Sequence, residues 1–204
     1  MEKVDFKKAL RALYNPKNTE LWEIVDVPEM KFLMVDGEGN PNTAASYSEA
    51  IEALYAVSYT LKFMSKRELG KDYVVSALEG LWYADDMSIF VKKKKDAYRW
   101  TMMIMQPEWI DDEMIASAIA EVKDSKNPAA LSKLYVRVYA EGKSAQLLHI
   151  GSYDDEAPKL LYLHDTYMPE HGYTFNGHHH EIYLSDSRKV APEKPKTILR
   201  QPIA

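Results

Sequence analysis

Cysteine is absent from this 204-residue chain, and that absence removes several kinds of chemistry at once. Disulfides, thiolate nucleophiles and cysteine-ligated metals are excluded. The lack of cysteine fits a reducing cytoplasm, where we expect the protein to reside. No stretch approaches the ~20 apolar residues of a membrane span, and residues 1–5 lack the apolar core of a signal peptide. We therefore expect no part of the chain to work in a membrane.

The sequence also lacks the usual signatures of phosphate binding and nucleophilic catalysis. It has no Gly-rich loop of the GxGxxG or GKS/T kind and no nucleophile-elbow serine. The formal net charge of −5 argues against a phosphate-tracking surface. The basic run Lys92–Lys95 is followed at once by Asp96, and we interpret it as a solvated loop, with phosphate binding as the alternative. Direct binding of nucleic acid is not expected.

What the chain does have is a large stock of apolar and aromatic side chains. Hydrophobic residues make up 46% of it, which is enough to build a core. There are 14 Tyr, 4 Trp, 5 Phe and 10 Met residues. Such side chains fill cores, and they also line adaptable pockets for flat organic molecules. Only their placement along the chain can separate the two uses.

The order of predicted elements recurs in the two halves of the chain. Apolar periodicity and turn residues predict, in order, a helix at 5–14, a strand at 30–35, a helix at 46–66, strands at 74–83 and 98–106, a linking helix within 111–134, a strand at 146–150, a helix from 154 or 155, and strands at 178–185 and 197–200. Ser46 with Glu49 forms a capping-box pattern, and Asp111 or Asp112 is the expected cap of the linking helix. Gly37 and Gly151 each follow the first strand of a half.

These patterns predict an α+β fold made of one domain, residues 1–204. Within it we expect two tandem βαββ units, at about 28–107 and 145–204, joined by the linking helix. The two units would be related by pseudo-twofold symmetry. A ligand cleft is then expected where they meet.

Aligning the two halves by Asp85 and Asp186 brings candidate site residues together. Gly80 then falls opposite Glu181. Because side chains of a strand alternate between faces, Gly80, Glu181, Trp82 and Tyr183 should share one face. The remaining apolar side chains, Leu81, Ile182 and Leu184, should point at the helices as core. The result is a carboxylate between two large aromatic rings, with room across from it.

Two kinds of chemistry follow from a carboxylate in such a setting. As a counter-ion, Glu181 with Trp82 and Tyr183 would hold a lipophilic cation by charge and cation–π attraction. As a catalyst, it would act as a general base or acid toward water. The alternative is an ordinary strand glutamate, solvated or tied to a neighbouring Lys or Arg.

The run His178–His179–His180–Glu181 raises the question of a metal site. On a strand, His178 and His180 share one face, whereas His179 and Glu181 share the other. Two ligands per face fall short of the three protein ligands of a catalytic zinc site. We therefore expect no metal and no cofactor, and His179 becomes a candidate ligand-binding residue beside Glu181.

Three further residues are second-rank candidates for ligand binding. Glu79 lies on the opposite face in a regular strand, but a bulge at Gly80 would bring it to the cleft. Tyr55 and Tyr59 form, with Phe63, a stripe at helical spacing. Aromatic stripes at helical spacing are more often part of the hydrophobic core than of a ligand-binding site. We therefore favour the core for this stripe.

The residues assembled above resemble the GyrI-like family, in particular its long stand-alone branch. The segments that carry the resemblance are PEM and DGEGNPN within 28–42, AIEALY and YTLKF within 50–63, LEGLW at 78–82, HHEIYLSD at 179–186 and KTILRQP at 196–202. They span nearly the whole chain after residue 20. The resemblance implies a tandem βαββ fold with a ligand cleft between the repeats, the family's pocket glutamate at Glu181 and its pocket aromatic at Trp82. Trp82–Tyr83 stands where the family has two tryptophans, which bears on ligand preference.

The resemblance implies three functions to weigh. Some stand-alone members look like hydrolases that open the cyclopropane of DNA-alkylating natural products, a detoxification in which Glu181 would be the acid–base group. Regulator members use the module to sense amphipathic, often cationic drugs, so a non-catalytic sensor or drug sequestrant is the alternative. A gyrase-inhibitor-like interaction protein is the third. The partner expected in the first two cases is a planar small molecule, and the oligomeric state is left open.

Overall fold

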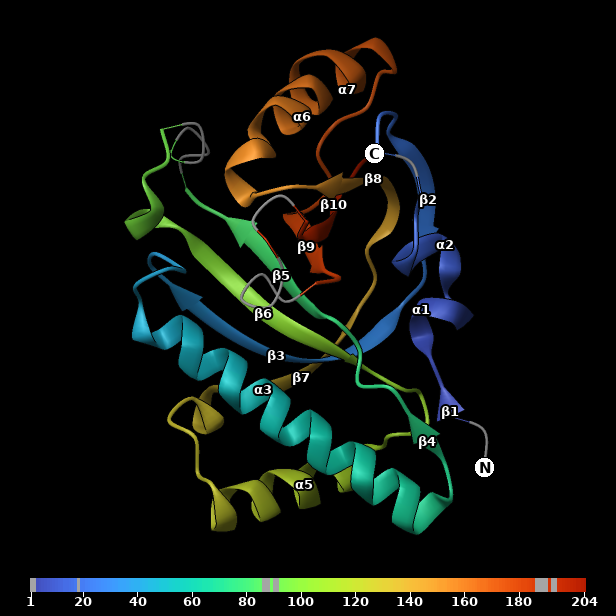
Figure 1. Ribbon diagram of the computed structural model, residues 1–204, viewed down its shortest axis with the longest axis vertical. Helices are drawn as coiled ribbons and strands as arrows, with labels where there is room; N and C mark the ends of the chain where they lie inside the picture. The colour runs from blue at the N-terminus through green and yellow to red at the C-terminus, as the bar shows by residue number, and fades with distance from the viewer. Residues whose placement is uncertain (1–2, 18, 86–88, 90–91, 186–190, 192–193) are drawn as a thin grey trace.

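The computed structural model describes residues 3–17, 19–85, 89, 92–185, 191 and 194–204. Eight strands form one curled sheet, a half-barrel in which all neighbouring strands run antiparallel (Figure 1). From edge to edge they are β2 (Glu23–Val27), β8 (Gly142–Ile150), β10 (Lys196–Pro202), β9 (His179–Tyr183), β5 (Leu78–Tyr83), β6 (Arg99–Gln106), β3 (Met30–Glu38) and β7 (Tyr135–Tyr139). The α+β class expected from the sequence is confirmed.

Helices cover the two halves of this sheet separately. In Figure 1 the long helix α3 (Ala45–Met64) and the linking helix α5 (Asp112–Ser125) lie below β3 and β6, while α6 (Ala157–Tyr162), the π-helical turn η5 (Leu163–Tyr167) and α7 (Met168–Glu170) lie above β8. The remaining elements are short: β1 (Lys3–Val4), α1 (Phe6–Ala9), α2 (Arg11–Tyr14), η1 (Ser65–Leu69), β4 (Asp72–Tyr73), η2 (Lys95–Ala97), η3 (Leu131–Lys133) and η4 (Tyr153–Asp155). No helix among the described residues is long and apolar enough to cross a membrane.

The two halves of the chain place corresponding strands in the same order, counted inward from opposite edges of the sheet. β3, α3, β5 and β6 of the first half have the same order as β8, α6, β9 and β10 of the second, and β5 pairs with β9 at the centre. β2 precedes β3 in the chain but pairs with β8, and β7 precedes β8 but pairs with β3. Each half therefore supplies the outermost strand of the other.

The helix α3 packs closely on the sheet because its inward face is small. Ala50, Ala53, Leu54, Val57 and Leu61 recur at three- and four-residue spacing, and all are fully buried. The alanines let the helix approach β3 and β6, and the larger residues fill the remaining space against the sheet. The helix continues as the turn η1 and ends at Gly70, whose φ of 65° is a left-handed conformation that glycine adopts at little cost.

One prediction about the faces of the sheet is wrong. We call the face that carries Trp82 and Glu181 the cleft face, and the face that carries Leu81 and His180 the reverse face. The long helix α3 packs in one cluster with Trp82, not with Leu81. Leu81 packs instead with Phe6 and Leu10 of the N-terminal segment, and Ile182 packs with Leu13 beside them. The predicted separation of helix face and ligand face fails because α3 and α6 flank the cleft and leave its centre open.

Of the two N-cap residues Asp111 and Ser46, one was predicted correctly from the sequence and the other was not. Asp111 caps α5, since its carboxylate accepts a hydrogen bond from Met114 N at 2.8 Å. Ser46 does not cap α3: the helix begins one residue earlier, after Ala44, and Ser46 Oγ contacts the carbonyl of Glu38 at 3.4 Å. The backbone of residues 40–44 already turns through bonds from Thr43 and Ala44 to Asn40, which sets the start of the helix.

Several element boundaries differ from the predicted ones. The strand predicted at 74–83 begins only at Leu78, and the helix predicted at 5–14 is broken at Leu10. The edge strands β2 and β7 were not predicted, because both mix exposed polar and apolar residues without clean alternation. Asp186, one of the two residues used to align the halves, lies outside the described residues.

Candidate functional site

A long cleft lies on the cleft face of the sheet between α3 and α6. Its floor is the central strand pair β5–β9, and its walls come from α3 on one side and from α6 with η5 on the other. The cleft encloses about 2170 Å³, against the ~300–1,000 Å³ of a common small-molecule pocket. It can therefore hold a ligand larger than a single fused ring system.

Gly80 and Glu181 form the centre of the floor. They are directly paired in the antiparallel register of β5 and β9, which is the juxtaposition predicted from the alignment of the two halves. A Cβ atom at Gly80 would stand 3.1 Å from Trp82 Nε1 and 3.2 Å from Tyr183 Oη. Glycine at this position thus leaves the space in which those two side chains meet.

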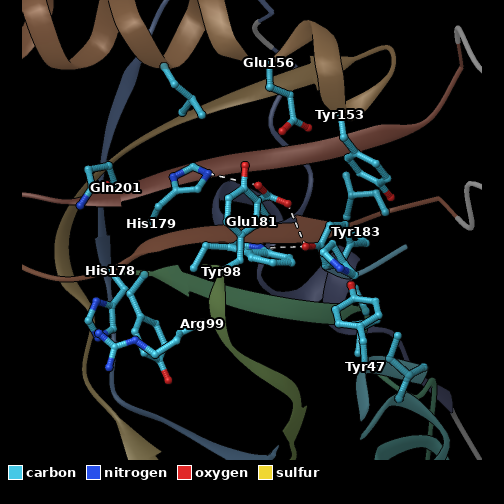
Figure 2. Close-up of a pocket in the computed structure, with 18 of the residues that line it drawn as sticks. Tyr47, Tyr98, Arg99, Tyr153, Glu156, His178, His179, Glu181, Tyr183 and Gln201 are labelled. Carbon is cyan, nitrogen blue, oxygen red and sulfur yellow. Dashed lines mark hydrogen bonds and ion pairs between the residues drawn. The ribbon is translucent and has the colours of Figure 1, made fainter. Parts of the chain in front are cut away.

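A chain of hydrogen bonds runs over Gly80 to the carboxylate. Trp82 Nε1 donates to Tyr183 Oη at 3.0 Å, and Tyr183 Oη donates to Glu181 Oε2 at 2.8 Å (Figure 2). Burial, and next the charge of Glu181, raise the pKa of Tyr183 well above its ordinary value. Tyr183 therefore keeps its proton and acts as a fixed donor to Glu181.

His179 lies on the other side of the same carboxylate. Its Nε2 is 3.4 Å from Glu181 Oε1, and its side chain is 10% exposed (Figure 2). The two residues are on one face of β9, as strand alternation predicts. Neither ring nitrogen of His179 has a hydrogen-bond partner in the part of the chain that the structure describes. The imidazole is thus buried beside a carboxylate without being tied to the protein.

Aromatic rings surround the carboxylate, and the predicted Trp82 is less accessible than its neighbours. Trp82 is only 6% exposed, because Tyr47 and Tyr98 pack against it with ring centroids 6.2 and 6.1 Å away. Tyr153 meets Tyr183 edge-on at 5.9 Å. Little of the Trp82 ring is left for stacking, so Tyr47, Tyr98 and Tyr153 present the aromatic surface around Glu181 (Figure 2).

The tyrosine stripe of α3 is not core. Tyr59 is 48% exposed and Phe63 is 57% exposed. Tyr55 and Tyr59 stack on each other at 6.1 Å and line the cleft wall. The interpretation as core is wrong because the buried stripe of α3 lies on a different side of the helix. Both tyrosines are where a ligand in the cleft would contact them.

Glu79, predicted as a second-rank ligand-binding residue, does not line the cleft. The strand has no bulge at Gly80, so Glu79 points to the reverse face, where it is fully buried. Its Oε1 accepts a hydrogen bond from Tyr14 Oη at 2.9 Å, and its Oε2 is 2.9 Å from His180 Nε2. Glu79 is therefore part of the buried structure and not of the cleft.

The reverse face carries a buried charge network that the sequence did not reveal. His180 Nδ1 is 2.8 Å from Glu141 Oε1, and Arg200 Nη1 donates to Glu141 Oε2 at 3.1 Å. Burial alone would lower the pKa of His180, but Glu141 and Glu79 raise it to about 9. Burial would raise the pKa of Glu141, but His180 and Arg200 lower it to about 2. All four charges in this network are paired.

Sequence reasoning missed several cleft residues. Glu156, at the N-cap of α6, is buried and reaches toward Glu181 from the opposite wall (Figure 2). Tyr47 and Ile51 extend the stripe of Tyr55 and Tyr59 toward the start of α3 at four-residue spacing, a signal that could have found them. No comparable pattern marks Glu156, because its position depends on how the second half packs.

The histidine run does not gather into a metal site. His178 precedes β9 and stacks on Tyr83, with ring centroids 4.4 Å apart. Among the described residues, no group of three or more His, Asp or Glu side chains is placed to hold a metal ion.

The chain belongs to the GyrI-like small molecule binding domain family, which matches residues 22–204. Among solved structures, an uncharacterized conserved protein from Listeria innocua is 38% identical, with a TM-score of 0.89 over 99% of this chain and 100% of that one. A hydrolase from Listeria innocua is 36% identical, with a TM-score of 0.85 and the same coverage. The C-terminal domain of EcmrR, 12% identical over 91% of this chain and 99% of its own, shares the fold with a TM-score of 0.57. No curated protein matches the chain significantly.

Proposed function

We propose that this protein is a small-molecule hydrolase that opens the cyclopropane ring of planar, DNA-alkylating cyclopropanoid compounds and so detoxifies them. The observation that carries the proposal is Glu181 itself, a carboxylate in an aromatic cleft with one oxygen held by Tyr183 and the other directed at His179. The similarity to a Listeria innocua hydrolase over the full length of both chains supports it. In this proposal the halves are tandem βαββ units related by a pseudo-twofold axis, and the ligand binds where they meet.

The proposed reaction needs a base for water and flat surfaces for the ring system. Glu181 takes a proton from a water molecule as the water oxygen bonds to a cyclopropane carbon. The carbon–carbon bond breaks, and its electron pair moves into the conjugated carbonyl of the substrate. The carbonyl oxygen then takes up one proton, so that the product is the substrate plus one water. Tyr47, Tyr98 and Tyr153 would hold the planar rings during this step.

A second candidate function is binding without turnover. The cleft is larger than a common small-molecule pocket, and it combines a buried carboxylate, Glu156, and a partly buried one, Glu181, with several tyrosines. An anionic aromatic cleft suits a lipophilic cation, since each desolvated cation–π contact contributes of order 1–2 kcal/mol. A drug sequestrant or effector sensor would use the same residues as the hydrolase.

The deciding experiment is incubation of the pure protein with a cyclopropanoid alkylator, followed by mass analysis for the water adduct. Wild-type protein should form ring-opened product catalytically, and Glu181→Gln should lose at least ~100-fold of that rate because a general base is removed. Glu170→Gln, at an exposed position on α7 outside the cleft, is the matched control and should retain the rate.

The outcome also separates the two candidate functions. Tight binding of a cationic dye by wild-type protein, with no product and selective loss of cation binding in Glu181→Gln, would support the sequestrant. Equal product formation by wild-type and Glu181→Gln proteins, both folded by circular dichroism, would exclude Glu181 as the base.

A further inference from the structure

The hydrogen-bond chain over Gly80 has a fixed direction. An indole nitrogen can only donate, so Trp82 Nε1 must give its hydrogen to Tyr183 Oη. The single hydrogen of the tyrosine hydroxyl is then left for Glu181 Oε2, 2.8 Å away. Oε2 is thereby fixed as an acceptor. Any proton that Glu181 takes up must be carried on its other oxygen, Oε1.

His179 lies beside that other oxygen. Its Nε2 lies 3.4 Å from Oε1, which is longer than a formed hydrogen bond but within the range that shortens when a ligand binds. Both ring nitrogens are buried and lack hydrogen-bond partners among the described residues. A buried imidazole without partners on a cleft wall is costly to the fold. This cost is explained if the nitrogens exchange protons with a ligand.

We propose that His179 and Glu181 act as a proton-sharing pair, in which Glu181 Oε1 passes the proton taken from water to His179 Nε2 and His179 delivers a proton to the ligand. The inference rests on the proposed hydrolase function and adds a second catalytic residue to it. Trp82, Tyr183 and Gly80 are positioning residues in this arrangement, because they commit Oε2 and so decide which carboxylate oxygen reacts.

The proton balance of the step closes without any further reagent. Neutral His179 begins with its hydrogen on Nδ1. Glu181 Oε1 takes a proton from water and hands it to Nε2, while Nδ1 gives its hydrogen to the carbonyl oxygen of the opened substrate. Substrate and water become product, Glu181 is again a carboxylate, and His179 is again neutral after its hydrogen returns to Nδ1.

Charged and titratable side chains surround His179 in the cleft. They include Glu181 on its own strand, Glu156 at the start of α6, His164 and Asp165 from η5, and His178, and the same cleft is also lined by Asp5, Lys7, Asp85, Lys93, Lys95 and Arg99. Burial, and next His179 itself, lower the pKa of His164 to about 4. His164 is therefore neutral near pH 7 and adds no positive charge beside the pair.

The pair is tested first by a measurement that needs no substrate. NMR titration of the imidazole signals, assigned with His179→Gln, should show that Glu181→Gln lowers the midpoint of His179 by about one pH unit, because an adjacent negative charge is lost. The signal of His171, which does not line the cleft and has its Nδ1 2.8 Å from the Tyr167 carbonyl, is the control and should not move. An unchanged His179 midpoint overturns the pair.

The second measurement is the pH profile of turnover. His179→Gln should lower kcat at least ~10-fold and remove one limb of the profile, while KM changes less than threefold. Retention of wild-type kcat and profile by a folded His179→Gln protein also overturns the proposal. If wild-type protein shows no turnover at all, the hydrolase function fails, and the titration still decides whether His179 and Glu181 share a proton.

Discussion

The two faces of strand β9 carry the same kinds of side chain in opposite conditions. On the reverse face, His180 contacts Glu79 and Glu141 at 2.9 and 2.8 Å, and Arg200 completes the charge balance. On the cleft face, His179 and Glu181 are 3.4 Å apart and His179 has no hydrogen-bond partner among the described residues. One strand thus places a close His–Glu set, with ion pairs of 2.9 and 2.8 Å, beside a looser pair at 3.4 Å.

The difference separates charged side chains that stabilise the fold from those that can react with or bind a ligand. A buried charge whose partners are all present contributes to a unique structure and is costly to disturb. A buried polar group with spare hydrogen-bonding capacity beside a cavity is free to engage a ligand. A neighbouring histidine alone would not separate Glu79 from Glu181, whereas the closeness of the ion pair, 2.9 Å for Glu79 and 3.4 Å for Glu181, does.

Replacement of His180 should have the largest effect on the free energy of unfolding. His180→Gln leaves Glu79 and Glu141 buried beside an uncharged residue, so the free energy of unfolding should fall by about 3–5 kcal/mol. Glu181→Gln, which keeps an acceptor for Tyr183, should change it by less than about 1 kcal/mol. Urea denaturation of both variants measures the two values. Equal losses would remove the distinction between the faces.

The pH dependence of stability provides the second test. The pKa of His180 is about 9 in the fold against an ordinary 6.5, so its contribution is complete below pH 6.5 and is lost as the pH rises through 9. The pKa of Glu141 is about 2 against an ordinary 4.5, so its contribution is complete above pH 4.5 and is lost as the pH falls through 2.

Wild-type protein should therefore be most stable between these limits and lose of order 2–3 kcal/mol on the alkaline side. Urea midpoints measured from pH 5 to pH 10 should fall in wild type and stay flatter in His180→Gln. Parallel curves for the two proteins would show that His180 is not held as a cation.

The smallest expected effect is that of Gly80→Ala. The added methyl would stand 3.1 Å from Trp82 Nε1 and 3.2 Å from Tyr183 Oη and so push the two apart. We expect about a tenfold loss of turnover with about 1–2 kcal/mol of destabilisation. The indole N–H resonance of Trp82 should shift as its hydrogen bond to Tyr183 weakens. An unshifted resonance would show that the floor accommodates the methyl group.

The centre of the site was predictable because it depends on local rules. Strand alternation and the alignment of the two halves were enough to place Gly80 opposite Glu181 and to group Trp82 and Tyr183 with it. The same rules kept Glu79 away from the cleft unless a bulge intervened, and no bulge does.

The rest of the site depends on packing between distant segments. Glu156 reaches Glu181 only because α6 lies over the second half of the sheet, and Glu141 meets His180 only because the connection between β7 and β8 returns to the reverse face. The small exposure of Trp82 follows from its contacts with Tyr47 and Tyr98. Hydrophobic periodicity and residue spacing do not predict such contacts, because the contacts join elements that are far apart in the sequence.

The exchange of outer strands between the halves has a consequence for how the chain folds during synthesis. Strand β2 leaves the ribosome long before β8, its one neighbour in the sheet among the described residues. Arg200 Nη2 likewise donates to the carbonyl of Leu13, 187 positions earlier in the chain. Pairings of such long range are slow to form, and unpaired strand edges are prone to aggregate while they wait. The segment before β3 therefore reaches its native partners only after β8 and β10 have been made, and the cleft is completed late.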